Sequence, residues 1–178
     1  LNNTAFFYQK GAKGVNIEPD PKLFKTISKA RKHDINLNIG VGSSNSSLPF
    51  YIMSSATLNT FDKAEAEEYQ KEGYKILEVK EVNVRDINTI MEKYFPSQPP
   101  DLLTIDVEGF DEAIIYDLNF EKYKPNSICI ETISFKTDGS GQKNKELIKY
   151  IKAQGYLLYG DTFINSIFVL NDFWNIKR

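Results

Sequence analysis

Cysteine, histidine and long apolar runs are scarce in this sequence of 178 residues. The single cysteine, Cys129, excludes an internal disulfide and favours a reducing compartment, so we expect a cytoplasmic protein with Cys129 as a small core residue. No apolar stretch approaches the roughly 20 residues that a membrane helix needs, and we expect no membrane partner. The net charge is only -2, which gives no electrostatic reason to expect a nucleic-acid partner.

The sequence also offers little to hold a metal ion. Its one histidine, His33, lies at the expected end of a helix, where an exposed position is typical. Asp106, Glu108 and Asp111 lie close together in the chain, but their spacing is not that of a calcium loop, which needs more oxygen ligands in register. We therefore expect no metal site.

Strand-like and helix-like segments alternate along most of the chain, which contains 41% hydrophobic and 26% charged residues. This length and composition fit one domain over residues 1–178. The predicted strands that matter for the site are 14–18, 36–42, 101–106 and 126–132. Helices are predicted at 19–32, 86–95, 111–118 and 142–154, and two strands around a turn at 156–170. The alternation predicts an α/β sheet, mostly parallel, with helices on both faces and an antiparallel last strand.

Three carboxylates follow one apolar strand in the stretch LLTIDVEGFD, residues 102–111. In a doubly wound sheet, ligands bind outside the carboxyl ends of the strands. Asp106 and Glu108 are therefore candidate site residues. The alternative is that Asp106 or Asp111 only caps the helix that begins near Phe110, and Asp111 is better explained in this way.

Glu18 ends another predicted strand, in the stretch NIEPDP. In nucleotide-binding sheets, an acidic residue at this place accepts hydrogen bonds from both ribose hydroxyls and lies about 20 residues after a glycine-rich turn. On that spacing, we expect the turn and the first strand to lie upstream of Leu1, so that residues 1–178 are N-terminally truncated. The alternative is that Glu18 only caps the helix that follows it.

Three segments in this order and spacing, GVNIEPDPKLFKTI, NLNIGVG and PDLLTIDVEGFDEAII, resemble the FkbM-type family of S-adenosylmethionine-dependent methyltransferases. The resemblance implies the class I methyltransferase fold, a Rossmann-like sheet of seven strands with the last one antiparallel. It also implies S-adenosylmethionine as cofactor and a hydroxyl of a sugar, polyketide or other small molecule as acceptor.

By this resemblance, Glu18 holds the ribose of the cofactor, and Asp20 shapes the turn beside it. Gly42 and Ser43 lie along the adenine. Asp106 and Glu108 face the methyl group and the acceptor, and Asp106 also lies near the methionine end of the cofactor. A carboxylate within hydrogen-bond reach of a hydroxyl can both align it and take its proton.

Two other classes of function fit parts of the pattern. Glu18 suits the ribose of NAD in an oxidoreductase equally well, and a domain without its first strand suits a binding role without catalysis. If that strand is absent, segments 14–18 and 101–106 are not direct neighbours, and residues 1–178 alone bind S-adenosylmethionine poorly. The sequence does not distinguish a small-molecule acceptor from a glycan, and it leaves the oligomeric state open.

Overall fold

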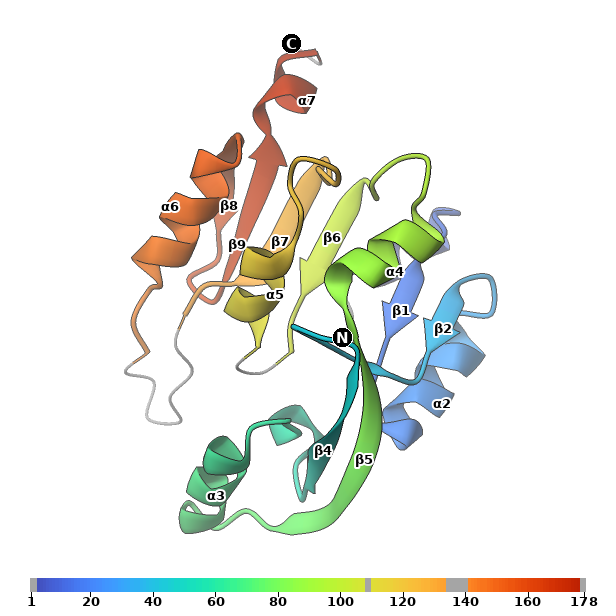
Figure 1. The fold of residues 1–178 in the computed structure, drawn as a ribbon, viewed down its shortest axis with the longest axis vertical. Helices are drawn as coiled ribbons and strands as arrows, with labels where there is room; N and C mark the ends of the chain where they lie inside the picture. The colour runs from blue at the N-terminus through green and yellow to red at the C-terminus, as the bar shows by residue number, and fades with distance from the viewer. Residues whose placement is uncertain (1–2, 108–109, 134–140, 177–178) are drawn as a thin grey trace.

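The computed structural model describes residues 3–107, 110–133 and 141–176 (Figure 1). Its strands are β1 (Val15–Ile17), β2 (Ile35–Leu37), β3 (Gly40–Gly42), β4 (Ser46–Met53), β5 (Ile76–Asp86), β6 (Leu102–Ile105), β7 (Ser127–Glu131), β8 (Tyr156–Asp161) and β9 (Asn165–Leu170). Its helices are α1 (Ala5–Gln9), α2 (Pro21–Ala30), the short 3-10 helix η1 (Ala56–Leu58), α3 (Lys63–Lys71), α4 (Ile87–Tyr94), α5 (Asp111–Asp117), α6 (Lys145–Ala153) and α7 (Asn171–Ile176). The alternation of strands and helices that the sequence predicted is confirmed.

The strands form three small sheets, so the prediction of one continuous sheet is wrong. β1 pairs with β2 in parallel, β5 lies between β3 and β4, and the largest sheet has the order β6-β7-β9-β8. Within these sheets the predicted directions are confirmed, because β6 and β7 are parallel and β9 is antiparallel to both of its neighbours.

The predicted strand 36–42 is divided into β2 and β3, which belong to different sheets. After β2, the side chain of Asn38 donates to the backbone oxygens of Glu18 and Pro19, at 2.8 and 2.9 Å. These bonds fix Asn38 beside the end of β1. The chain then enters β3 at Gly40, which pairs with Val84 of β5.

β1 and β6 are not paired with each other, which confirms the prediction that segments 14–18 and 101–106 are not direct neighbours. The backbone N–H of Ser127 in β7 donates to the oxygen of Asp101, at 2.9 Å. Because backbone groups of alternate residues point to opposite sides of a strand, those of Leu102 and Thr104 point away from β7. The β1–β2 pair lies on that side of β6 (Figure 1).

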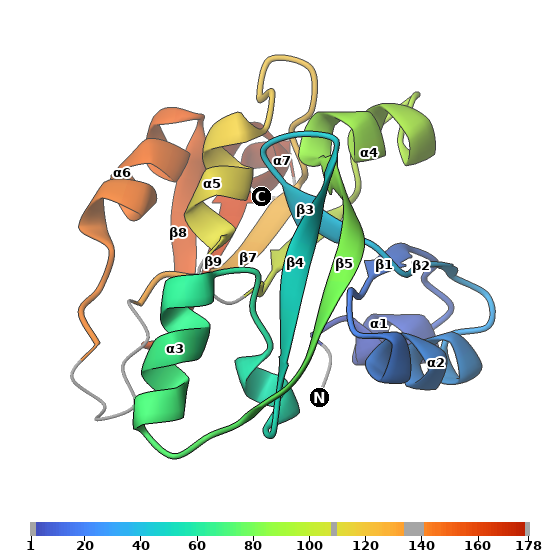
Figure 2. The same cartoon turned by 60° about the horizontal axis from the view of Figure 1, so that its bottom comes forward.

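β4, η1, α3 and β5 form a projection, residues 46–86, which we call the arm. β4 and β5 are antiparallel along their length, and α3 lies beside β4 (Figure 2). Tyr51, Met53, Leu58, Ala66 and Tyr69 bury one another between these elements. The arm lies at the end of the molecule toward which β6 points, so it stands next to the carboxyl ends of the strands (Figure 1).

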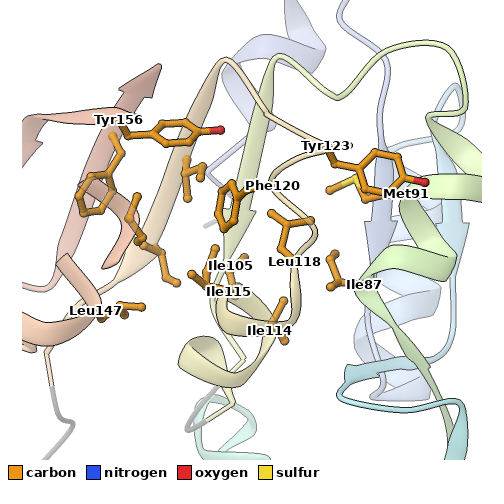
Figure 3. Close-up of a cluster of buried hydrophobic side chains, with 14 residues drawn as sticks. Ile87, Met91, Ile105, Ile114, Ile115, Leu118, Phe120, Tyr123, Leu147 and Tyr156 are labelled. Atoms are coloured by element: carbon orange, nitrogen blue, oxygen red, sulfur yellow. The ribbon is translucent and has the colours of Figure 1, made fainter. Parts of the chain in front are cut away.

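The main core lies between the β6-β7-β9-β8 sheet and the helices α4, α5 and α6 (Figure 3). Ile128 and Ile130 of β7 are fully buried and alternate with the half-buried Cys129. Full burial of each such aliphatic side chain contributes about 1.5–3 kcal/mol. One face of β7 therefore belongs to the core, and its other face carries Cys129 and Glu131. No helix in the described residues is long and apolar enough to cross a membrane.

Candidate active site

Glu18 directly follows β1, and its side chain is half-buried at the carboxyl end of that strand. One of its oxygens, Oε1, accepts a hydrogen bond from the backbone N–H of Asp20 at 2.8 Å. Burial raises the pKa of Glu18, and this N–H opposes the rise because it favours the charged form. The described residues place no hydrogen-bond donor on the second oxygen, Oε2. That oxygen is free to accept from the hydroxyl groups of a ligand.

Asp20 holds the turn that carries Glu18. Its Oδ1 accepts from the backbone N–H groups of Lys22 and Leu23, at 2.6 and 3.3 Å, which caps α2. Its Oδ2 accepts from the side chain of Asn59 in the arm, at 2.9 Å. The side chain is only 3% exposed. Asp20 therefore shapes the turn, and both of its oxygens are used within the protein.

Gly42 and Ser43 lie at the end of β3, which is hydrogen-bonded to β5 and not to the β1–β2 pair. A Cβ atom on Gly42 would lie 2.9 Å from Cγ1 of Val84, so the close packing of β3 on β5 accounts for this glycine. Ser43 is exposed. The contact of both residues with adenine stays a prediction.

Asp106 is exposed directly after β6, and Glu131 ends the neighbouring strand β7. Ile105 and Ile130 are the last aligned pair of these two strands. Glu131 is the last residue of β7 and lies on the sheet face opposite to Ile130, whereas Asp106 is the first residue after β6. Glu108, the second predicted catalytic residue, lies outside the described residues.

Asp111 does not cap α5, so this prediction is wrong. The residue at the cap position is Phe110, which makes no side-chain cap bond, and Asp111 is the first residue of the helix. Its side chain is 8% exposed, and its Oδ1 has no hydrogen-bond partner in the described part of the chain. Burial, with the charge of Asp106 in addition, raises the pKa of Asp111 to about 6. The N–H groups of Asp111 itself and of Val107 act in the opposite direction.

Glu131 is half-buried at the same place. Its pKa is raised to about 7, first by burial and then by the charges of Asp111, Asp106 and Glu65. Glu65 belongs to α3, where its carboxylate accepts from the hydroxyls of Thr60 and Tyr69, at 2.6 and 3.1 Å. The strand ends, the start of α5 and the arm thus bring four carboxyls within electrostatic reach of one another.

Aromatic side chains connect the arm to the start of α5, where Asp111 lies. The ring of Phe61 lies 4.7 Å from the ring of Phe50, measured between centroids, and 6.3 Å from the ring of Phe110. Phe61 and Phe110 are both partly exposed. We use the name rim for the residues at the carboxyl ends of β6 and β7 and the start of α5, namely Asp106, Phe110, Asp111 and Glu131.

Comparison with known proteins decides the family. A family model described as the methyltransferase FkbM domain matches residues 1–158. The chain belongs to the FkbM methyltransferase family. A search of curated proteins and a search of solved structures each found no match. The resemblance seen in the sequence is confirmed, and with it S-adenosylmethionine-dependent methyl transfer as the activity of the family.

The FkbM family implies a Rossmann-like fold and S-adenosylmethionine as cofactor, and the residues at the end of β1 fit that cofactor. Glu18 presents an oxygen without a protein donor in the described residues, and a ribose supplies hydroxyl donors. The carboxyls of the rim suit a cationic sulfonium. When bound, the cofactor supplies an activated methyl group.

Asn38 and Asn59 also support the candidate site, and the sequence did not indicate them. Asn38 binds the two backbone oxygens at the end of β1. Asn59 binds Asp20 with its Nδ2, and its Oδ1 accepts from the N–H of Met53 at 2.8 Å. Asn38 lies inside the segment 36–42 that was predicted to be a single strand, so the pattern did not indicate its role. Asn59 lies in an irregular stretch, where only the fold shows its partner.

Proposed function

We propose that this FkbM methyltransferase is an O-methyltransferase that acts on a hydroxyl group of a small molecule or a glycan. The observation that carries the proposal is the placement of Asp106 directly after β6 and of Glu131 at the end of β7, at the carboxyl ends of two paired parallel strands. Carboxylates are hydrogen-bond acceptors, so they bind a donor such as a hydroxyl and can take its proton. The proposal is consistent with the partly exposed rings of Phe61 and Phe110, which offer an apolar surface beside the carboxyls.

In this proposal, Glu18 binds the ribose through its Oε2, while Asp20 keeps the turn in place. Gly42 and Ser43 lie toward the adenine, as the family resemblance implies. Asp106 and Glu108 align the acceptor hydroxyl, and Asp106 is also near the methionine end of the cofactor. The protein has to position the acceptor oxygen and help remove its proton, because the methyl group is already activated in the cofactor.

Cofactor binding tests the first half of the proposal. Calorimetry with S-adenosylmethionine, on the native protein that contains residues 1–178, should show binding that Glu18→Gln weakens by roughly 1–3 kcal/mol. The exposed Glu121 gives a matched control, since Glu121→Gln should leave the affinity unchanged. Equal affinity of the wild type and the Glu18 variant would return Glu18 to a structural role. Binding of NAD in place of S-adenosylmethionine would favour an oxidoreductase.

The acceptor half needs a separate measurement. The wild-type protein is incubated with S-adenosylmethionine that carries a labelled methyl group, together with a panel of sugars and small alcohols. Transfer of label to a hydroxyl oxygen, located by mass spectrometry, is the expected result. Transfer of label to nitrogen or carbon acceptors alone would contradict O-methylation while leaving family membership intact.

A further inference from the structure

Three carboxyls of the rim come from three different elements. Asp106 directly follows β6, Glu131 ends the paired strand β7, and Asp111 adds a carboxyl from the first turn of α5. The charge of Asp106 acts on the other two, and the charge of Asp111 acts on Glu131, so all three are close. None of them takes part in an ion pair with another described residue. Nothing on these elements therefore neutralises the group.

Asp111 distinguishes this group from an ordinary acidic surface. The side chain is 8% exposed, and its Oδ1 lacks a hydrogen-bond partner within the ranges that the structure describes. A buried carboxyl with an unsatisfied oxygen favours its neutral form, because the charge has lost the solvation of water. Since its charge acts on Glu131, the two side chains do not ionise independently.

We propose that Glu131 accepts the proton of the acceptor hydroxyl during methyl transfer, and that the enclosed Asp111 is its positioning partner. The inference rests on the proposed O-methylation. Glu131 is the member that reaches a ligand, because it is half-buried whereas Asp111 is enclosed. Across the sheet, Glu131 is aligned with Asn165 of β9, which carries no charge.

The proton moves from the acceptor hydroxyl to Glu131 and then to solvent. The O–H bond of the acceptor breaks, and its electron pair stays on the acceptor oxygen, which becomes the nucleophile. The proton passes to a carboxylate oxygen of Glu131, so that this side chain becomes neutral. It then leaves to solvent through the exposed part of Glu131.

The burial of Asp111 and Glu131 and the charges near them bring the pKa values of both side chains close to neutral pH. Burial raises the pKa of Asp111 to about 6 and that of Glu131 to about 7. Asp106 raises both, Glu65 of α3 raises the pKa of Glu131, and Glu112 of α5 raises the pKa of Asp111. A general base works best when its pKa lies near the operating pH. Glu131 therefore has a pKa that suits a general base near neutral pH.

Carbon-13 NMR of the side-chain carboxyls, without any ligand, tests whether Asp111 acts on Glu131. Glu131 should titrate near pH 7, and Asp111→Asn should lower its midpoint by roughly one pH unit, since a like charge is removed. The control variant Glu121→Gln should leave the midpoint unchanged. A midpoint at the ordinary value of glutamate, or one that Asp111→Asn does not move, overturns the inference.

The rate of methyl transfer against pH then tests the catalytic role. Glu131→Gln should lower turnover about 10²–10⁴-fold. Asp111→Asn should move the acid limb of the profile to lower pH by the shift that NMR gives, and should retain the rate at high pH. An acid limb that stays in place while the NMR midpoint moves overturns the role of Glu131, even if Glu131→Gln fails to fold. Failure of the wild type to bind S-adenosylmethionine refutes the proposed function instead, and the NMR result is independent of it.

Discussion

Replacing Asp111 by asparagine should stabilise the protein at high pH and change its stability little at low pH. The pKa of Asp111 is raised from 3.8 to about 6, chiefly because the side chain is buried. A shift of about two pKa units corresponds to roughly 3 kcal/mol of differential free energy between the two protonation states. With 8% of the side chain exposed, solvent screening reduces this amount little. Part of the shift belongs to the neighbouring carboxyls, so we expect an effect of about 2–3 kcal/mol.

The sign follows from the direction of the shift. Because the folded-state pKa of Asp111 is raised, its contribution to stability is fully present below the unfolded value of 3.8 and is lost as the pH rises through about 6. The wild type should lose this contribution between roughly pH 4 and pH 7. Asparagine at position 111 does not ionise, so the variant should keep the same stability over this pH range. Its advantage over the wild type should therefore grow with pH.

Urea unfolding followed by circular dichroism, at about pH 4 and about pH 8, measures the free energy of unfolding of both proteins. The difference between the two pH values cancels packing effects, because asparagine and a protonated aspartate have nearly the same shape. Asp117 is exposed on the same helix, so Asp117→Asn is the matched control and should show no comparable pH dependence. A stability difference between wild type and Asp111→Asn that is equal at both pH values would refute the reasoning.

Three further substitutions test the site and its support. Asp106→Asn should lower the rate of methyl transfer by about 10²–10⁴-fold with little change in the melting temperature, and full activity would remove Asp106 from the mechanism. Gly40→Ala should destabilise the fold by about 1–3 kcal/mol in urea unfolding, because a Cβ there would lie 2.5 Å from the ring of Phe61; an unchanged midpoint would show that the ring moves freely. Asn59→Ala should cost about 1–3 kcal/mol, since it leaves the buried Asp20 short of a donor, whereas a neutral effect would show that water replaces the amide.

Local sequence patterns predicted the elements whose structure depends on near neighbours. The helical pattern of residues 19–32 predicted α2, and the structure confirms this helix with narrower bounds, from Pro21 to Ala30. The apolar run ending at Ile105 predicted β6, and the short connection before the last strand predicted that β9 is antiparallel. Each of these signals lies within a few residues of the feature that it predicts.

Features that depend on distant contacts were not predicted. The division of 36–42 into two strands depends on Asn38, whose partners lie at the end of β1, and on the approach of Phe61 to Gly40. Asp111 matched the pattern of a helix cap, yet the fold buries it beside Glu131. A sequence pattern shows that a carboxylate stands at a helix start, but only packing decides whether water reaches it.

The arm has a consequence for how the two ends of the site respond to ligands. Asn59 binds the turn that carries Glu18, and the ring of Phe61 contacts that of Phe110 at the rim. If the arm shifts when a ligand occupies one end, these contacts carry a free-energy change to the other. Thermodynamic linkage is reciprocal, so each ligand then alters the affinity of the other by the same factor. Asn59 is thus a point where a single substitution would loosen that coupling without touching either ligand.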